Sequence, residues 1–228
     1  MTSDPRGDRP PRVLLLYYTF TGQALRVLEA AGEVFSERGF QVHKARIEFT
    51  DRRFAERFSR FPLRHAMLDL LSMLPAQARR AAGEIRTPDE VRNGQYDLVC
   101  IGSSTWWFTM NMPMRTFLTS DEAEKLLTGT PFAAFCVCRR YWRGNFRLAR
   151  KLGEKRGGRY MGGIHFEYLG GQFASGLSMI SYLRSGQYRD RYLGVPIPAT
   201  NVQPYQLEQT RHFAAELADR LVTQPAPR

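Results

Sequence analysis

Apolar residues gather along the chain in short uninterrupted runs, which lie at residues 12–18, 96–101, 131–137 and 159–166. Runs of this length are typical of strands that are buried on both faces of a parallel sheet, although glycines weaken the pattern in the last run. Residues 40–47 instead alternate between apolar and polar positions, which predicts a more exposed strand. The pattern therefore predicts five strands.

Between the strands, apolar positions recur with the spacing of helices. The first helix follows the first strand and ends at Gly39, and its apolar face consists of Ala24, Val27, Leu28, Ala31 and Phe35. Three more helical stretches are predicted at residues 114–127, 144–156 and 204–222. Strands that alternate with helices indicate an α/β fold, in which a doubly wound parallel sheet of five strands carries helices on both faces.

The chain is longer than five strand–helix units require, and the excess falls in two places. Residues 49–92 interrupt the path from the second strand to the third, and residues 168–203 interrupt the path from the fifth strand to the last helix. We therefore predict one domain over residues 12–222 with two insertions. Residues 1–11, rich in Pro, Arg and Asp, are predicted to be a disordered tail, and residues 223–228 form a second tail.

Charge and cysteine content narrow the possible partners. The chain has 33 Lys and Arg against 22 Asp and Glu, a net charge of +11 that suits nucleic acid, a membrane surface or an anionic small molecule. The basic residues are spread without a block or a nucleic-acid motif, so nucleic acid is an unlikely partner. Cys100, Cys136 and Cys138 are odd in number and lack metal-ligand spacing. We expect a reduced, cytoplasmic protein without a metal.

Ligands of open parallel sheets bind beyond the carboxyl ends of the strands, where the strand order reverses. The loop after the first strand leads directly into a helix and consists of Thr19, Phe20, Thr21, Gly22, Gln23 and Ala24. Backbone N–H groups at the positive end of a helix dipole suit a phosphate monoester; Gly22 permits close approach, and Thr19, Thr21 and Gln23 add donors. Dinucleotide and ATP fingerprints are missing. The alternative is an ordinary helix cap.

Two further loops add aromatic and basic side chains at the same edge. The loop after the third strand contains Ser103, Ser104, Thr105, Trp106 and Trp107. Its tryptophans suit a planar ring, although one of them is expected to pack on the following helix instead. The loop after the fourth strand contains Arg139, Arg140, Tyr141, Trp142 and Asn145. It either faces the same ring and a negative charge or is a basic helix start. Together the three loops predict a site for a phosphorylated flat ring.

Three segments of the chain resemble the flavodoxin-like superfamily: VLLLYYTFTGQALRVLEA, YDLVCIGSSTWWFTMNMPMRTFL and PFAAFCVCRRYW. The resemblance covers residues 12–166 and the last helix. It implies the strand order 2-1-3-4-5 and FMN as cofactor, with its phosphate on residues 19–24. It also implies flavin contacts from the two later loops: Ser103, Ser104, Thr105, Trp106, Trp107, Arg139, Arg140, Tyr141 and Asn145. In the loop after the fourth strand, CRRYWRGN stands where the family usually has a Gly- and Asp-rich sequence.

A narrower likeness, carried by CRRYW and GGQFASG, is to flavodoxin-like chains labelled dialkylresorcinol-condensing enzymes. It implies a role beside aromatic or lipid biosynthesis. The resemblance and the basic charge favour an oxidoreductase that passes a hydride from NAD(P)H through FMN to a quinone-like or aromatic acceptor, commonly as a homodimer. His165 and Tyr168 are candidate catalytic acids, whereas a lone His is also a common structural hydrogen-bonding residue.

Two other classes of function stay open. One is an electron carrier, or a binding domain that has kept the fold and lost the flavin. The other is a protein peripheral to the inner face of the membrane. In this second hypothesis the Arg- and Phe-rich residues 52–64 and the Leu- and Met-rich residues 63–74 form a basic amphipathic segment that lies in the lipid interface. The insertions are expected to cover the flavin, form a dimer face or contact lipid.

Overall fold

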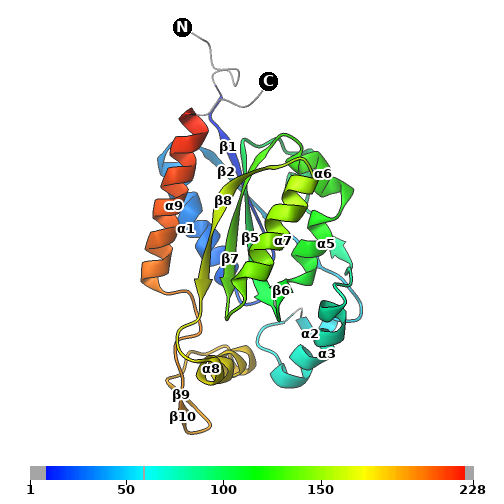
Figure 1. Cartoon of the computed structure of the whole chain (residues 1–228), viewed down its shortest axis with the longest axis vertical. Helices are drawn as coiled ribbons and strands as arrows, with labels where there is room; N and C mark the ends of the chain where they lie inside the picture. The colour runs from blue at the N-terminus through cyan, green and yellow to red at the C-terminus, as the bar shows by residue number, and fades with distance from the viewer. Residues whose placement is uncertain (1–8, 59, 224–228) are drawn as a thin grey trace.

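The centre of the molecule is a parallel sheet, seen in a computed structural model that describes residues 9–58 and 60–223 (Figure 1). Its strands follow the order β2-β1-β5-β7-β8. In that order they span Gln41–Arg46, Arg12–Tyr17, Leu98–Trp106, Pro131–Cys138 and Arg159–Glu167. All neighbouring pairs on this path are parallel. The predicted α/β architecture and the strand order 2-1-3-4-5 are therefore confirmed.

Strand β1 separates two apolar cores. Val13 and Leu15 pack in the layer that contains α1 (Gln23–Glu37) and α9 (Pro204–Thr223). Leu14 and Leu16 pack in the opposite layer. The helices of that layer are α4 (Asp89–Asn93), α5 (Met112–Leu118), α6 (Asp121–Leu127) and α7 (Trp142–Lys155). Because successive side chains of a strand point to opposite faces, a strand covered on both faces is apolar throughout.

Two predicted elements differ from the structure. The helix expected over residues 114–127 is two helices, α5 and α6, because Ser120 begins a new one: its Oγ accepts a hydrogen bond from the backbone N of Ala123 at 3.3 Å. The third strand of the sheet, β5, continues past residue 101 to Trp106 and turns back through β6 (Thr109–Met110), which pairs antiparallel to it. The predicted loop after the third strand, residues 102–113, is thus largely strand.

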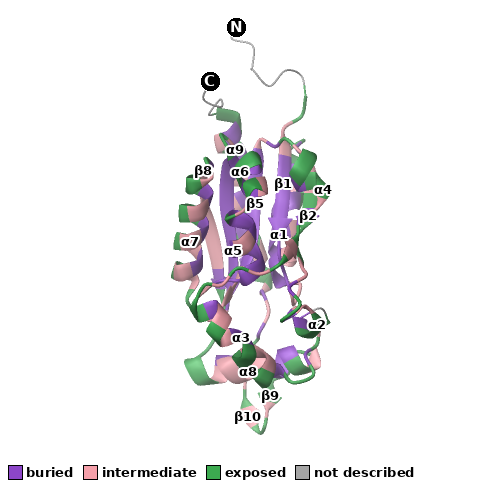
Figure 2. Ribbon diagram, turned by 90° about the vertical axis from the view of Figure 1, so that its right-hand side faces the viewer, coloured by how far each residue is buried: buried purple, intermediate pink, exposed green. Residues whose placement is uncertain are grey.

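Most of each insertion lies beyond the carboxyl ends of the parallel strands, at the lower end of Figures 1 and 2, whereas residues 89–92 of the predicted first insertion belong to α4, which packs on the sheet. The first contains α2 (Ala55–Phe58) and α3 (Ala66–Ala78), and is flanked by the paired short strands β3 (Glu48–Phe49) and β4 (Ile85–Arg86). The second contains α8 (Gln172–Ser185) and a small hairpin of β9 (Arg191–Tyr192) and β10 (Val195–Pro196).

The two insertions meet and share a third apolar core. Its buried residues come from both insertions and from the start of α5: Phe54, Phe58, Leu63, Ala66, Met73, Met112 and Leu183. The backbone N of Leu63 donates a hydrogen bond to the carbonyl oxygen of Leu183 at 2.7 Å. The rings of Phe61 and Tyr182 lie 5.2 Å apart between centroids. Segments more than 100 residues apart in the sequence therefore form one unit over the sheet edge.

The phenylalanines of the first insertion are buried or half-buried, whereas an amphipathic segment that lies on a membrane would expose them. Phe54 and Phe58 are each only 7% exposed, and Phe61 is half-buried. The prediction that residues 52–64 present their phenylalanines to lipid is therefore wrong. The reason is that the second insertion and the aromatic side chains of the sheet edge cover these rings, which the sequence of the segment alone does not reveal.

Helix α3 shows the same difference. Leu63 precedes the helix and is buried, while the buried residues of the helix itself include Ala66 and Met73. Met67 and Leu71, which belong to the predicted apolar face, are 48% and 46% exposed. The segment is apolar on more than one side, so helical spacing alone does not identify its inner face.

The predicted tails fall mostly outside the described residues, which exclude 1–8 and 224–228. Arg9, in the described part of the first tail, forms an ion pair with Asp97 at 2.9 Å. At the other end, α9 continues to Thr223, one residue past the predicted end of the domain. Within residues 9–58 and 60–223, no helix has both the length and the apolar character needed to span a bilayer.

Candidate functional site

A cavity of about 330 Å³ lies beyond the carboxyl ends of β1, β5 and β7. The loop after β1 and the ends of β5 and β7 form its floor and walls. Its roof comes from the two insertions: Phe58, Leu63, Leu70 and Met73 from the first, and Tyr168, Gln172, Met179 and Leu183 from the second. The sheet order reverses between β1 and β5, which is the place where doubly wound sheets bind ligands.

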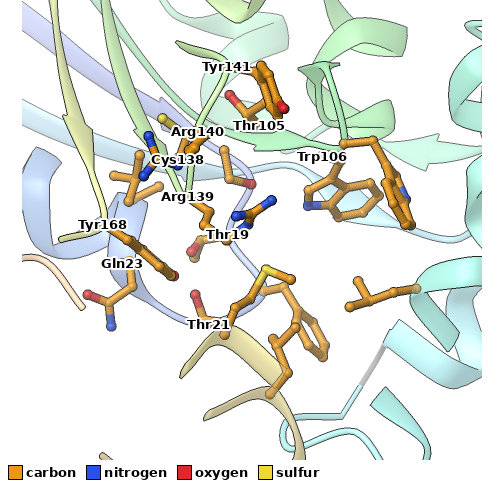
Figure 3. A pocket seen from close by; sticks show the side chains of 18 of the residues that line it. Thr19, Thr21, Gln23, Thr105, Trp106, Cys138, Arg139, Arg140, Tyr141 and Tyr168 are labelled. Atoms are coloured by element: carbon orange, nitrogen blue, oxygen red, sulfur yellow. The ribbon is translucent and has the colours of Figure 1, made fainter. Parts of the chain in front are cut away.

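The first turn of α1 opens onto this cavity. Gly22 stands at the N-cap with φ at 79°, a left-handed conformation that glycine adopts without strain, and no side chain caps the helix. The first turn carries no acidic residue, and the N–H groups there have no partner within the helix. Thr19 and Thr21 line the cavity beside this turn (Figure 3). The predicted phosphate loop is therefore placed as an anion site requires.

Gln23 has a different role from the one predicted for its side chain. Its Oε1 accepts a hydrogen bond from the backbone N of Val202 at 2.9 Å, and its Nε2 donates to the Tyr188 hydroxyl at 3.2 Å. In Figure 3 the amide points away from the centre of the pocket. The expectation that this side chain donates to a phosphate is corrected: it fastens the loop to the second insertion, and only its backbone remains at the helix start.

Both tryptophans line the cavity, and Trp106 also packs against neighbouring aromatic rings. Trp106 packs against Tyr18 and Phe58, with ring centroids 5.6 Å and 5.8 Å away, and lies across the pocket from Tyr168 in Figure 3. Trp107 lines the cavity at the tip of the β5–β6 turn with φ at 58°. A bulky residue in the left-handed region is strained, and such strain is common at ligand sites.

The loop after β7 places one aromatic residue at the cavity and one outside it. Tyr141 lines the cavity, also in a left-handed conformation (φ 65°), and its ring lies 5.2 Å from that of Phe108. Trp142 is not among the lining residues and stacks on His165, with 3.7 Å between ring centroids. Of the two alternatives for covering a bound ring, the structure therefore presents Tyr141.

Ser103 and Asn145 lie behind the cavity wall. Ser103 Oγ donates to Asn145 Oδ1 at 2.9 Å, and Asn145 Nδ2 donates to Thr105 Oγ1 at 3.2 Å. Both residues are buried, and neither lines the cavity, whereas Ser104 and Thr105 do. The prediction of direct cofactor contacts from Ser103 and Asn145 is thus corrected, because their hydrogen bonds join β5 to α7.

Two arginines line the cavity, and within residues 9–58 and 60–223 neither forms an ion pair with a carboxylate. Arg139 Nη1 donates to the carbonyl oxygen of Gln172 at 3.2 Å and to Ser175 Oγ at 3.3 Å. Arg140 Nη2 donates to the carbonyl oxygen of Gly170 at 2.7 Å, and its buried Nε has no partner. Among the described residues, no Asp or Glu lines the cavity. The wall therefore carries uncompensated positive charge.

Of the two candidate acids, only Tyr168 lines the cavity. His165 lies on β8 outside the cavity, and burial beneath Trp142 lowers its pKa below the ordinary value. Its predicted catalytic role is corrected, because its ring packs against the start of α7. Tyr168 lines the cavity, and burial, followed by the neighbouring Tyr182, raises its pKa. The Tyr168 hydroxyl therefore stays protonated at neutral pH and is a hydrogen-bond donor.

Comparison with solved structures finds the same architecture. A flavoprotein from Lactobacillus acidophilus NCFM in complex with FMN is 18% identical, covers 68% of this chain and 93% of its own, and has a TM-score of 0.50. A flavodoxin from the domain Archaea and oxidised flavodoxin 2 from Bacillus cereus are each 13% identical and cover 92% of this chain and 99% of their own, with TM-scores of 0.52 and 0.51. The chain has a flavodoxin-like fold. No family model and no curated protein matches its sequence.

Within this flavodoxin-like fold, the residues that sequence reasoning missed are mainly those of the roof. Leu70, Met73, Met179 and Leu183 are ordinary apolar residues whose position over the cavity depends on how two distant insertions meet. Cys138 also lines the cavity; a hydrogen bond with Cys136 and burial raise its pKa, so it stays a thiol. In the sequence, Cys138 stands at the end of an apolar run, directly before the basic loop, and this position is the signal that places it near the cavity.

Proposed function

We propose that the cavity binds FMN. The observation that carries this proposal is the pairing of an uncapped helix start at Gly22 with an aromatic wall in one cavity that no carboxylate of the described residues lines. An anion is favoured at the first turn of α1 by its free N–H groups and the helix dipole. The cavity volume of about 330 Å³ lies within the usual range for small-molecule sites.

The residues present fit such a cofactor. Thr19, Thr21 and the backbone of residues 22–24 would hold the terminal phosphate, while Trp107 and Tyr141 would contact the ring system. Aromatic faces bind planar rings at little conformational cost. Riboflavin lacks the phosphate, and FAD carries a diphosphate where FMN has a dianionic monoester, so the site should distinguish the three.

We further propose that the protein is an oxidoreductase that uses NAD(P)H and a quinone-like or aromatic acceptor. Bound FMN supplies the hydride chemistry. The apolar roof would keep water from the reacting ring. Arg139 and Arg140, which donate to uncharged oxygens of the second insertion, would suit the phosphates of a nucleotide. Tyr168 is placed to donate a hydrogen bond to an acceptor oxygen. An electron carrier needs an accessible flavin edge, whereas here two insertions cover that region.

The phosphate assignment is tested by titrating the protein, stripped of any bound flavin, with FMN, riboflavin and FAD. Thr21→Glu should lower FMN affinity by about 1,000-fold, since like charges about 4 Å apart cost about 4 kcal/mol near a protein surface. Riboflavin binding should fall much less. Thr223→Glu adds the same charge at the far end of α9 and should leave both affinities unchanged. If the Thr21→Glu variant binds FMN as tightly as the unmodified chain, the phosphate does not bind beside Thr21.

The oxidoreductase assignment is tested by anaerobic stopped-flow absorbance. Flavin absorbance should bleach after mixing with NADPH, and faster than with NADH. Arg139→Gln and Arg140→Gln should reduce the preference for NADPH, because the 2′-phosphate loses a charged partner. Arg92→Gln, on α4 at the other end of the molecule, is the matched control. Bleaching by neither nucleotide would instead favour the electron carrier.

A further inference from the structure

Large exposed apolar side chains concentrate on the two insertions. Of eleven such residues in the described chain, seven belong there: Met67, Leu68, Leu71, Leu169, Phe173, Tyr188 and Leu193. The exposed fractions of Leu68, Phe173 and Leu193 are 67%, 72% and 80%. Single exposed apolar residues are ordinary on a protein surface, whereas a contiguous group marks an interaction site.

An open groove of about 420 Å³ joins several of these residues into one surface. It runs between the start of α3, the outer side of α8 and the β9–β10 hairpin. Its apolar lining residues are Ala66, Met67, Leu68, Leu177, Ile180, Tyr192 and Leu193, and its charged lining residues are Arg64 and Arg184. We call this the outer surface of the roof.

The outer surface of the roof carries an excess of positive charge. Residues 60–74 and 172–196 contain five arginines and only two acidic residues, Asp69 and Asp190. Among the described residues, neither Arg64 nor Arg184 has a carboxylate partner. The exposed apolar side chains are thus bordered by unpaired guanidinium groups, which favours an anionic and apolar neighbour.

The helices of the roof are apolar on both sides. On α3, Leu70 and Met73 line the inner cavity, while Met67 and Leu68 line the outer groove. On α8, Met179 and Leu183 face the cavity, while Leu177 and Ile180 face the groove. A helix that covers a core on one side and meets water on the other has a polar outer face. The apolar outer face therefore needs a partner of its own.

We propose that the outer surface of the roof docks on an anionic lipid bilayer. Arg64 and Arg184 would lie at the headgroups, and Met67, Leu68 and Leu193 would enter the boundary of the acyl chains. A second copy of the chain fits less well, because a two-fold interface would place this surface against itself and its arginines against arginines. The docking goes beyond the proposed redox function and does not depend on which cofactor fills the cavity.

This orientation places the roof of the cavity against the membrane. Helices α3 and α8 then lie between the cavity and the lipid, and both present apolar side chains to each side. An acceptor that dissolves in lipid would reach the site between these helices without crossing water. The residues that would enter the lipid differ from the phenylalanines of residues 52–64, which are directed into the protein.

The test is flotation of the purified full chain with vesicles of phosphatidylcholine alone or of phosphatidylcholine with phosphatidylglycerol. The protein should float with the anionic vesicles and stay behind with the neutral ones, and binding should weaken as salt is added. Binding to neither vesicle, or equal binding to both, would overturn the proposal. Light scattering on the lipid-free protein tests whether a second copy of the chain covers this surface instead. A dimer that Leu193→Ser dissociates would also overturn the proposal.

Matched variants locate the surface. Leu68→Ser and Leu193→Ser should each lower the binding constant for anionic vesicles about tenfold, while Val222→Ser, at an exposed apolar position on α9, should not. Arg64→Gln and Arg184→Gln should each lower it about fivefold and flatten the salt dependence. Arg92→Gln on α4 is the charge control. If the controls weaken binding as much as the variants of the roof, the contact lies elsewhere and the assignment is wrong.

Discussion

The sheet and the insertions are held together in different ways. In β1 and β7 nearly every side chain is buried, and the helices on both faces complete two large apolar cores. The insertions share a smaller core and keep much apolar surface exposed. The sheet therefore holds the larger share of the buried apolar core and forms the floor of the cavity, whereas the insertions form its roof.

Polar contacts compensate for the small core of the insertions. Arg115 on α5 is 5% exposed and has no carboxylate partner among the described residues. Its guanidinium donates to Gln77 Oε1 at 3.2 Å, to the carbonyl oxygen of Ala81 at 2.8 Å and to that of Met110 at 3.0 Å. The end of α3 is thus fastened to the domain by a buried charge, and burial lowers the pKa of Arg115 to about 10.

The largest expected effect contrasts the two regions directly. Phe132 on β7 is fully buried, and Phe132→Ala should lower the free energy of unfolding by about 3–5 kcal/mol, because the cavity left behind adds to the lost transfer energy. Met67→Ala on α3 should change it by less than about 0.5 kcal/mol. Urea denaturation followed by circular dichroism measures both. Similar losses in the two variants would show that the outer face of α3 is buried in solution.

The next effect concerns the attachment of the roof. Arg115→Ala removes the donor from Gln77 Oε1 and from the carbonyl oxygen of Ala81, whereas the carbonyl oxygen of Met110 keeps its hydrogen bond from Gln77 Nε2. Stability should therefore fall by about 1–3 kcal/mol, reduced by relief of the buried charge. Limited proteolysis should cut first within residues 50–92 and leave the sheet intact. Arg92→Ala, on the exposed face of α4, is the control and should show neither change. Uniform cleavage along the chain would mean that the roof and the sheet unfold together.

The sequence predicts the sheet far better than the roof, for a physical reason. A strand covered on both faces must be apolar throughout, so β1 and β7 are recognisable from their own residues. The inner face of α3 is decided by its contact with α8, about 110 residues later, and no local pattern records that contact. The same holds at the site. Gln23 and Asn145 have amide side chains that could bind a ligand, but each forms hydrogen bonds with another part of the chain instead.

The smallest expected effect probes the joint between the insertions. Tyr182 on α8 packs against Phe61 and stacks on Tyr188, and burial together with the Tyr188 hydroxyl raises its pKa to about 12. A tyrosine whose pKa is higher in the folded state than the value near 10 in the unfolded state adds stability below pH 10, which is lost as the pH rises from 10 to 12.

Tyr182→Phe removes this titration. The free energy of unfolding, measured by urea titration at several values between pH 9 and 11.5, should then fall less steeply than in the unmodified chain, by about 2 kcal/mol at most over the interval. Tyr205→Phe, at an exposed position on α9, should leave the slope unchanged. If the two variants have equal slopes, Tyr182 ionises as freely in the folded protein as in the unfolded chain. The joint over the cavity would then be open to water rather than sealed, and the roof would be a mobile cover instead of a fixed one.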